Sequence, residues 1–93
     1  MLSKIPVDLT KLPEEAIDRE VLRVAIIAEL DAVNLYEQLA QMASNPLLKK
    51  VFYDIAREEK THVGEFQALL LELDKEQAQE LEEGKKEVDE MRQ

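Results

Sequence analysis

The stretch ASNPLLKK, residues 43–50, interrupts a helical pattern that continues on both sides of it. Ser44 or Asn45 can cap the start of a helix, and Pro46 suits a first helical turn, where its missing N–H costs no hydrogen bond. The stretch therefore predicts a bend that joins a helix over about residues 14–43 to a helix over about residues 46–73. The two helices would form an antiparallel hairpin.

The composition favours an all-α fold. The chain has 93 residues, 2 glycines and no cysteine, and it is rich in Ala, Leu, Glu, Lys and Gln, which are good helix formers. A core of this size is marginal, and neither a disulfide nor a cysteine-ligated metal can reinforce it. We therefore expect part of the stability to come from association. The lack of cysteine also suits a reducing cytoplasm.

The net charge argues against two classes of partner. With 21 acidic and 12 basic residues, the charge of -9 repels nucleic-acid backbones and anionic membrane surfaces. No apolar run reaches the roughly 18 residues of a transmembrane helix. The segment MLSKIPVDLTKLPEE, residues 1–15, lacks the apolar core of a signal peptide. We expect no nucleic-acid partner and no membrane association, and cations are suitable ligands.

The N-terminal segment lacks a helical period. Residues 1–12 are therefore predicted to form an extended arm. Pro13 suits the first helical position, and Glu14 and Glu15 suit the positive end of the helix dipole. The helical hairpin is predicted to occupy residues 13–73.

The last segment, residues 74–93, is predicted to be a third helix. Asp74 can cap its start, and Gly84 weakens its middle. Its few apolar residues form a stripe that either docks on a partner or lies on a solvated helix. The stripe consists of Ala78, Leu81, Val88 and Met91.

Each long helix carries apolar residues at alternating steps of three and four, which is typical of a helix that packs on another. The first seam is Leu22, Ile26, Glu29, Val33, Tyr36 and Ala40. The second seam is Leu48, Phe52, Ile55, Glu59, His62, Phe66 and Leu69. Glu29 interrupts the first seam, and Glu59 and His62 interrupt the second. Such groups need a cation or a hydrogen-bond partner, and neither seam contains Lys or Arg.

The three ionisable residues lie at one height in the predicted hairpin. Glu29 is sixteen residues before Asn45, and Glu59 and His62 are fourteen and seventeen residues after it. At about 1.5 Å per residue, these separations correspond to heights of roughly 24, 21 and 25 Å. The Glu-x-x-His spacing alone is weak evidence in so acidic a chain. The match between two helices predicts a metal site made of all three residues.

One hairpin supplies half of the ligands of a ferritin-like di-iron site. In such a site, two helices each give a Glu and two others each give a Glu-x-x-His pair. A twofold dimer of hairpins would supply both halves and complete a four-helix bundle. Mixed carboxylate and imidazole ligands suit Fe(II) or Mn(II), whereas structural zinc more often brings cysteine. The ligand types leave Fe(II) and Mn(II) open, with zinc as a further competitor.

Two segments, AIIAELDAVNLYEQLA (residues 25–40) and IAREEKTHVGEFQALL (residues 55–70), closely resemble encapsulated ferritins, which are two-helix ferritin-like proteins held inside encapsulin nanocompartments. The resemblance implies a ferroxidase that oxidises Fe(II) to Fe(III) at a homodimer interface, for iron storage and detoxification. It further implies a ring of ten subunits in the cytoplasm, with the encapsulin shell protein as a partner. Carried over by position, Glu29 and His62 are terminal iron ligands and Glu59 bridges the two irons.

Two further residues belong to this interpretation. Tyr36 matches a tyrosine near the family's site, but it lies about 10 Å along the helix from Glu29. We expect it to support the ligands without binding metal, or to be a core residue. Asp31 either guides ions toward the centre or is a solvated charge. It interrupts a second apolar stripe, which calls for further neighbours: Val21, Val24, Ala28 and Leu35.

The sequence differs from encapsulated ferritins in one respect, and other functions are also considered. Encapsulated ferritins reach their shell through a C-terminal targeting peptide or a fusion, and neither is evident at VDEMRQ, residues 88–93. A rubrerythrin-like peroxidase with a rubredoxin domain would need four cysteines, and the chain has none. The alternative functions are a structural helical hairpin without enzymatic activity, which is indifferent to metal removal, and a passive metal-binding protein, which does not speed iron oxidation.

Overall fold

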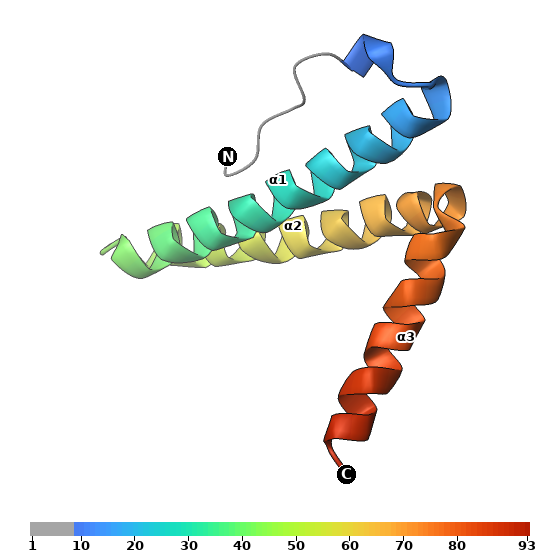
Figure 1. Cartoon of the computed structure of the whole chain (residues 1–93). Helices are drawn as coiled ribbons and strands as arrows, with labels where there is room; N and C mark the ends of the chain where they lie inside the picture. The colour runs from blue at the N-terminus through green and yellow to red at the C-terminus, as the bar shows by residue number, and fades with distance from the viewer. Residues whose placement is uncertain (1–8) are drawn as a thin grey trace.

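The computed structural model describes residues 9–93, and every regular element in that range is helical. A 3-10 helix, η1 (Leu9–Lys11), precedes α1 (Glu14–Met42), α2 (Pro46–Leu73) and α3 (Lys75–Met91). Helices α1 and α2 lie antiparallel, and α3 leaves the end of the hairpin at a steep angle (Figure 1). The predicted all-α fold, a helical hairpin followed by a C-terminal helix, is confirmed.

The predicted N-terminal arm needs a correction in its last part. Residues 1–8 lie outside the described residues, but Leu9–Lys11 form η1 and are not extended. Short 3-10 turns are common next to the start of an α-helix. Because Leu12 precedes a proline, helical backbone is disfavoured at that position. Pro13 therefore separates η1 from α1, and its carbonyl accepts the N–H of Ile17 at 3.0 Å.

The bend is held by side chains from both of its ends. Asn45 is the residue that caps α2: its Oδ1 accepts the N–H groups of Leu47 and Leu48 at 2.8 and 3.2 Å. Lys49 donates its ammonium to the carbonyls of Ala40 and Gln41, at 3.1 and 3.0 Å. Carbonyls at the end of a helix lack partners within that helix. The stretch of residues 43–50 therefore ends α1 and also starts α2.

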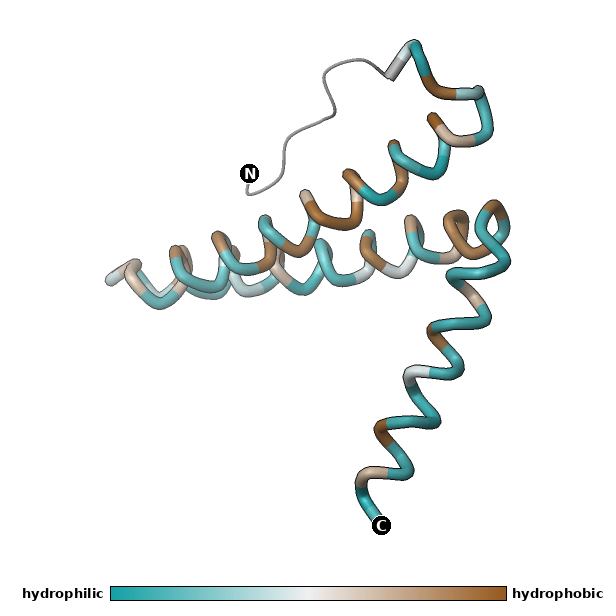
Figure 2. The backbone as a smooth tube through the Cα atoms, in the orientation of Figure 1, coloured by the Kyte–Doolittle hydropathy of each residue, from teal (hydrophilic) through white to brown (hydrophobic). Residues whose placement is uncertain are grey.

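The core of the hairpin is thin. Among the described residues, the buried apolar side chains are Val33, Ala40, Ala56 and Leu70. The two alanines let the helix backbones approach closely. Many larger apolar side chains of α1 and α2 stay exposed. Figure 2 shows hydrophobic residues, in brown, along both helices. A two-helix hairpin has too little interior to cover all the apolar surface of its helices.

The second predicted seam is offset from the buried face of α2. The buried residues of α2 are Ala56 and Leu70. They follow by one position the seam residues Ile55 and Leu69, respectively. Leu69 is half exposed. One position corresponds to about 100° around a helix, so the predicted line follows the edge of the contact face. His62 belongs to this line, and it therefore lies at the flank of the contact with α1.

Helix α3 begins where α2 ends. Asp74 donates its N–H to the carbonyl of Leu70 at 2.9 Å, and its Oδ1 accepts the N–H of Gln77 at 3.0 Å. The helix continues through Gly84, has no buried residue and is largely hydrophilic in Figure 2. None of the helices in the described part of the chain combines the length and the apolar character that a membrane span needs.

Candidate metal centre

Three ionisable side chains meet between the two hairpin helices. Glu29 comes from α1, and Glu59 and His62 come from successive turns of α2. One potential ligand atom of each residue lies within 4.8 Å of those of the other two. Within the described part of the chain, this is the only group of three such side chains close enough to share a metal ion. The register of the hairpin, counted from Asn45, predicts this meeting.

The imidazole of His62 is the centre of the cluster. Its Nδ1 lies 3.4 Å from Oε2 of Glu29 and 3.4 Å from Oε2 of Glu59. The contact with Glu59 follows from the spacing of three residues, which places both side chains on one side of α2. The contact with Glu29 joins the two helices. One nitrogen thus faces two carboxylates from different helices.

Exposure differs among the three side chains. The side chains of Glu29 and Glu59 keep 19 and 18 % of their surface, whereas that of His62 keeps 43 %. Among the described residues, no Lys or Arg forms an ion pair with either carboxylate. Two carboxylates are therefore withdrawn from water without a permanent cation, which is unfavourable unless something positive binds between them. The cluster opens to the surface on the side of His62.

The donor set fits a divalent transition metal. Oxygen and nitrogen ligands lie about 2.0–2.2 Å from such an ion, so two ligand atoms of one ion can be up to roughly 4.4 Å apart. Both contacts of Nδ1, at 3.4 Å, are within this limit. Carboxylate oxygens with a single imidazole suit iron or manganese, and three protein ligands leave coordination positions open. The role of these residues as ligands stays a prediction.

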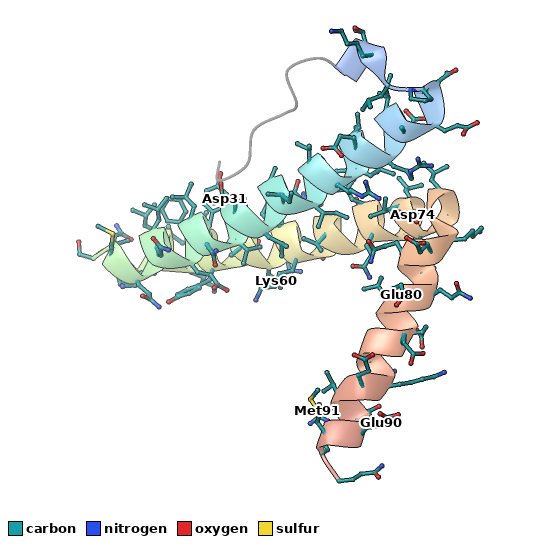
Figure 3. The ribbon with its side chains drawn as sticks, in the orientation of Figure 1. Asp31, Lys60, Asp74, Glu80, Glu90 and Met91 are labelled. Carbon is teal, nitrogen blue, oxygen red and sulfur yellow. The ribbon has the colours of Figure 1, made fainter. Side chains whose placement is uncertain are left out.

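The other two predicted site residues are not in this cluster. The ring of Tyr36 stacks on that of Phe52, with centroids 6.0 Å apart and an angle of 18° between the planes. This contact is the packing role that was the alternative for Tyr36. Asp31 lies two residues after Glu29, which is about 200° around the helix. Figure 3 shows it on the upper side of α1. Supporting roles for both residues stay predictions.

One polar contact beside the cluster was not anticipated. Lys60, the neighbour of Glu59, places its ammonium 3.3 Å from Oε2 of Glu37 on α1. Figure 3 shows Lys60 at the lower edge of α2. Water reaches both side chains, which keep 61 and 42 % of their surface, so the pair contributes little stability. A search for opposite charges on the two helices could have found it.

The sequence of this chain is similar to those of known proteins. Residues 20–92 match the rubrerythrin family. The ferritin-like-encapsulin shell fusion protein of Pyrococcus furiosus is 60% identical over 72 residues, which are 77% of this chain and 21% of that protein. The encapsulin nanocompartment cargo protein EncB of Myxococcus xanthus is 40% identical over 53 residues, which are 57% of this chain and 34% of that protein. The chain thus spans between a fifth and about a third of the length of these relatives.

A solved structure shares the whole arrangement. The crystal structure of the encapsulated ferritin domain from Pyrococcus furiosus matches with a TM-score of 0.82 at 48% sequence identity. The match covers 94% of this chain and 94% of that one, so it includes α3 as well as the hairpin. The resemblance inferred from the two helical segments is confirmed. The chain belongs to the rubrerythrin family, and within it to the encapsulated ferritins.

Proposed function

We propose that Glu29, Glu59 and His62 form half of a di-iron ferroxidase centre, and that the same residues of a second chain complete it. The observation that supports this proposal best is the convergence of two shielded carboxylates on one imidazole nitrogen, without a Lys or Arg to neutralise them. Because the chain supplies no permanent counterion within the described residues, a metal is the ligand that best balances the site. Family membership favours iron over manganese or zinc.

The second half of the site comes from a homodimer. The flank position of His62, with 43 % of its side chain exposed, opens the cluster toward a neighbouring molecule. Leu30, the residue that follows Glu29 on α1, is also exposed. A twofold dimer that covers this side would gather four carboxylates and two imidazoles, complete a four-helix bundle and bury apolar surface. The site and the apolar faces thus call for the same partner.

Metal and dimer should favour each other. Without metal, four carboxylates at one interface repel each other, and two divalent ions neutralise them. The free energy of metal binding then stabilises the dimer, since the complete ligand set exists only there. We therefore propose that iron loading drives or strengthens association.

The residues have distinct proposed tasks. Glu29, Glu59 and His62 would hold the iron, which would supply one-electron chemistry from Fe(II) to Fe(III) with O2 or peroxide as the electron acceptor. Glu29 and His62 would bind at the ends of the site, and Glu59 would bridge its two halves. Anionic oxygens favour the ferric product, because they are hard ligands. His62 has to present a neutral Nδ1, so protonation of this atom competes with metal binding.

We also propose that the oxidised iron is stored inside an encapsulin shell in the cytoplasm. Two relatives support this: one is a ferritin-like-encapsulin shell fusion protein and the other is an encapsulin nanocompartment cargo protein. In the proposed assembly, dimers join into a ring of ten subunits. Such a ring has no closed cavity of its own, and the shell protein would supply the compartment.

The test is the rate of ferric formation when air is admitted to protein and Fe(II) prepared under nitrogen. Glu59→Gln and His62→Ala should lose the acceleration over protein-free buffer. The matched control is Glu58→Gln, which makes the same chemical change one position away and outside the cluster; it should keep the rate. The subunit state of each sample is recorded by light scattering. A wild-type protein that assembles and binds iron, but oxidises it no faster than buffer, would be a passive metal-binding protein.

A further inference from the structure

Helix α3 is an arm with few supports. Beyond its first turns it stands clear of the hairpin (Figure 1), and it contains no buried residue. Its apolar stripe stays open, because Leu81, Val88 and Met91 keep 42, 49 and 81 % of their surface. In Figure 3, Met91 lies on the side of α3 that faces the space beneath the hairpin. Packing along its length therefore does not fix the direction of α3.

The connection between α2 and α3 is a single residue. Asp74 lies between Leu73 and Lys75, and its backbone is not helical, with φ -132° and ψ 88°. Its N–H closes α2 and its Oδ1 opens α3. These two hydrogen bonds attach the helix ends to the same residue. Neither of them opposes rotation about the N–Cα bond of Asp74, because the N–H stays with α2 while the side chain turns together with α3.

A third contact reaches this pivot from the other hairpin helix. Nη2 of Arg23 on α1 donates to Oδ2 of Asp74 at 2.7 Å, across 51 residues of sequence. Figure 3 shows Asp74 at the corner where the hairpin and α3 meet. Only 15 % of the Asp74 side chain is exposed. The pKa of Asp74 is lowered, mainly because its carboxylate accepts the backbone N–H of Gln77, and Arg23 and Arg19 lower it further.

The corner beneath this ion pair is hollow. A groove of about 310 Å³ lies where the three helices meet. Its apolar walls come from all three helices: Ile26, Ile27, Leu70, Leu71 and Leu81. Arg23 lines the same groove. Apolar packing therefore leaves this corner unfilled, and a contact from α1 is needed to hold it.

We propose that the Arg23–Asp74 ion pair is a latch that sets the angle between α3 and the hairpin. It ties the carboxylate that starts α3 to α1, away from the axis of α2, and so resists rotation at the pivot. With 17 residues at about 1.5 Å each, α3 is a lever of roughly 25 Å, and a rotation of about 20° moves its tip by roughly 9 Å. The latch thereby determines the direction in which the apolar stripe of α3 is presented. The inference is independent of the metal site.

Distance measurements between two spin labels test the latch in the full chain. Because the chain has no cysteine, Gln38→Cys on α1 and Lys86→Cys on α3 give one labelled pair per molecule. Labelled chains are diluted into excess unlabelled chains of the same variant, so each distance is measured within one molecule. Asp74→Asn removes the carboxylate charge but keeps a side chain that caps helices well. Arg23→Gln removes the other partner and leaves Asp74 in place.

Both variants should shift the mean distance by up to about 6 Å or broaden its distribution about twofold. Lys86 lies roughly 18 Å along α3 from Asp74, so a rotation of about 20° displaces it by roughly 6 Å. The matched control is Asp54→Asn, which removes an ion pair of 2.8 Å with Arg57 inside α2 and should leave the distribution unchanged. Circular dichroism of each variant measures helix content. Unchanged distances in both variants overturn the latch. A change in only one of them also overturns it, since both remove the same contact.

Discussion

Asn45→Ala should destabilise the hairpin at the point where its two helices are joined. In the structure, Oδ1 of Asn45 accepts two backbone N–H groups, at 2.8 and 3.2 Å. Alanine leaves both donors without this partner, although exposure lets water replace part of the loss. Removing a good N-cap costs about 1 kcal/mol, within a range of about 0.5–2. For a domain of this size, about 1 kcal/mol lowers the melting temperature by roughly 4–8 °C.

The assay is thermal unfolding followed by circular dichroism, at one protein concentration and with a chelator present, because assembly and metal would shift the transition. Ser44→Ala is the matched control: Ser44 was the other candidate cap, and it should change the melting temperature by less than about 2 °C. Asn45→Asp should retain most of the stability, since a carboxylate caps equally well. Equal loss of stability in Ser44→Ala and Asn45→Ala would refute the assignment of the cap.

Three further predictions concern packing, pH and metal. Ala56→Leu should lower the free energy of unfolding by about 1–3 kcal/mol, because Ala56 is buried between the helices, whereas Leu47→Ala should change it by less than about 0.5; denaturant unfolding measures both. Because the pKa of Asp74 is lowered, its carboxylate contributes to folding stability above the ordinary pKa of an aspartate. This contribution is lost as pH falls through the lowered pKa. The thermal stabilities of wild type and Asp74→Asn should therefore converge at that low pH. Added Mn(II) at about 100 times its dissociation constant should raise the free energy of unfolding of wild type by about 2.7 kcal/mol and leave Glu59→Gln nearly unchanged.

Local signals predicted the hairpin well. Pro46 and the residues before it break the helical pattern within a few positions, so the expected helices over 14–43 and 46–73 nearly equal Glu14–Met42 and Pro46–Leu73. The height of the cluster followed from the same register. The buried face of α2 was predicted less accurately from the sequence. Alternating steps of three and four fit two neighbouring lines on α2, and only packing against α1 selects the line through Ala56.

Features that depend on distant residues were not predictable in the same way. The direction of α3 involves Arg23 and Asp74, which are 51 positions apart and belong to no local motif. The stacking of Tyr36 on a ring of the other helix required the position of Phe52. The 3-10 turn at Leu9–Lys11 has no periodic pattern, because it is shorter than one period of an amphipathic helix.

The central claim is that two chains share one di-iron site, and native mass spectrometry of an anaerobic Fe(II) titration tests it most directly. The method reports the number of subunits and the number of iron ions in the same particle. A shared site predicts two irons per dimer, little iron on the monomer and loss of binding in Glu59→Gln but not in Glu58→Gln. Monomers that bind iron as tightly as dimers, or equal binding by both variants, would contradict the shared centre.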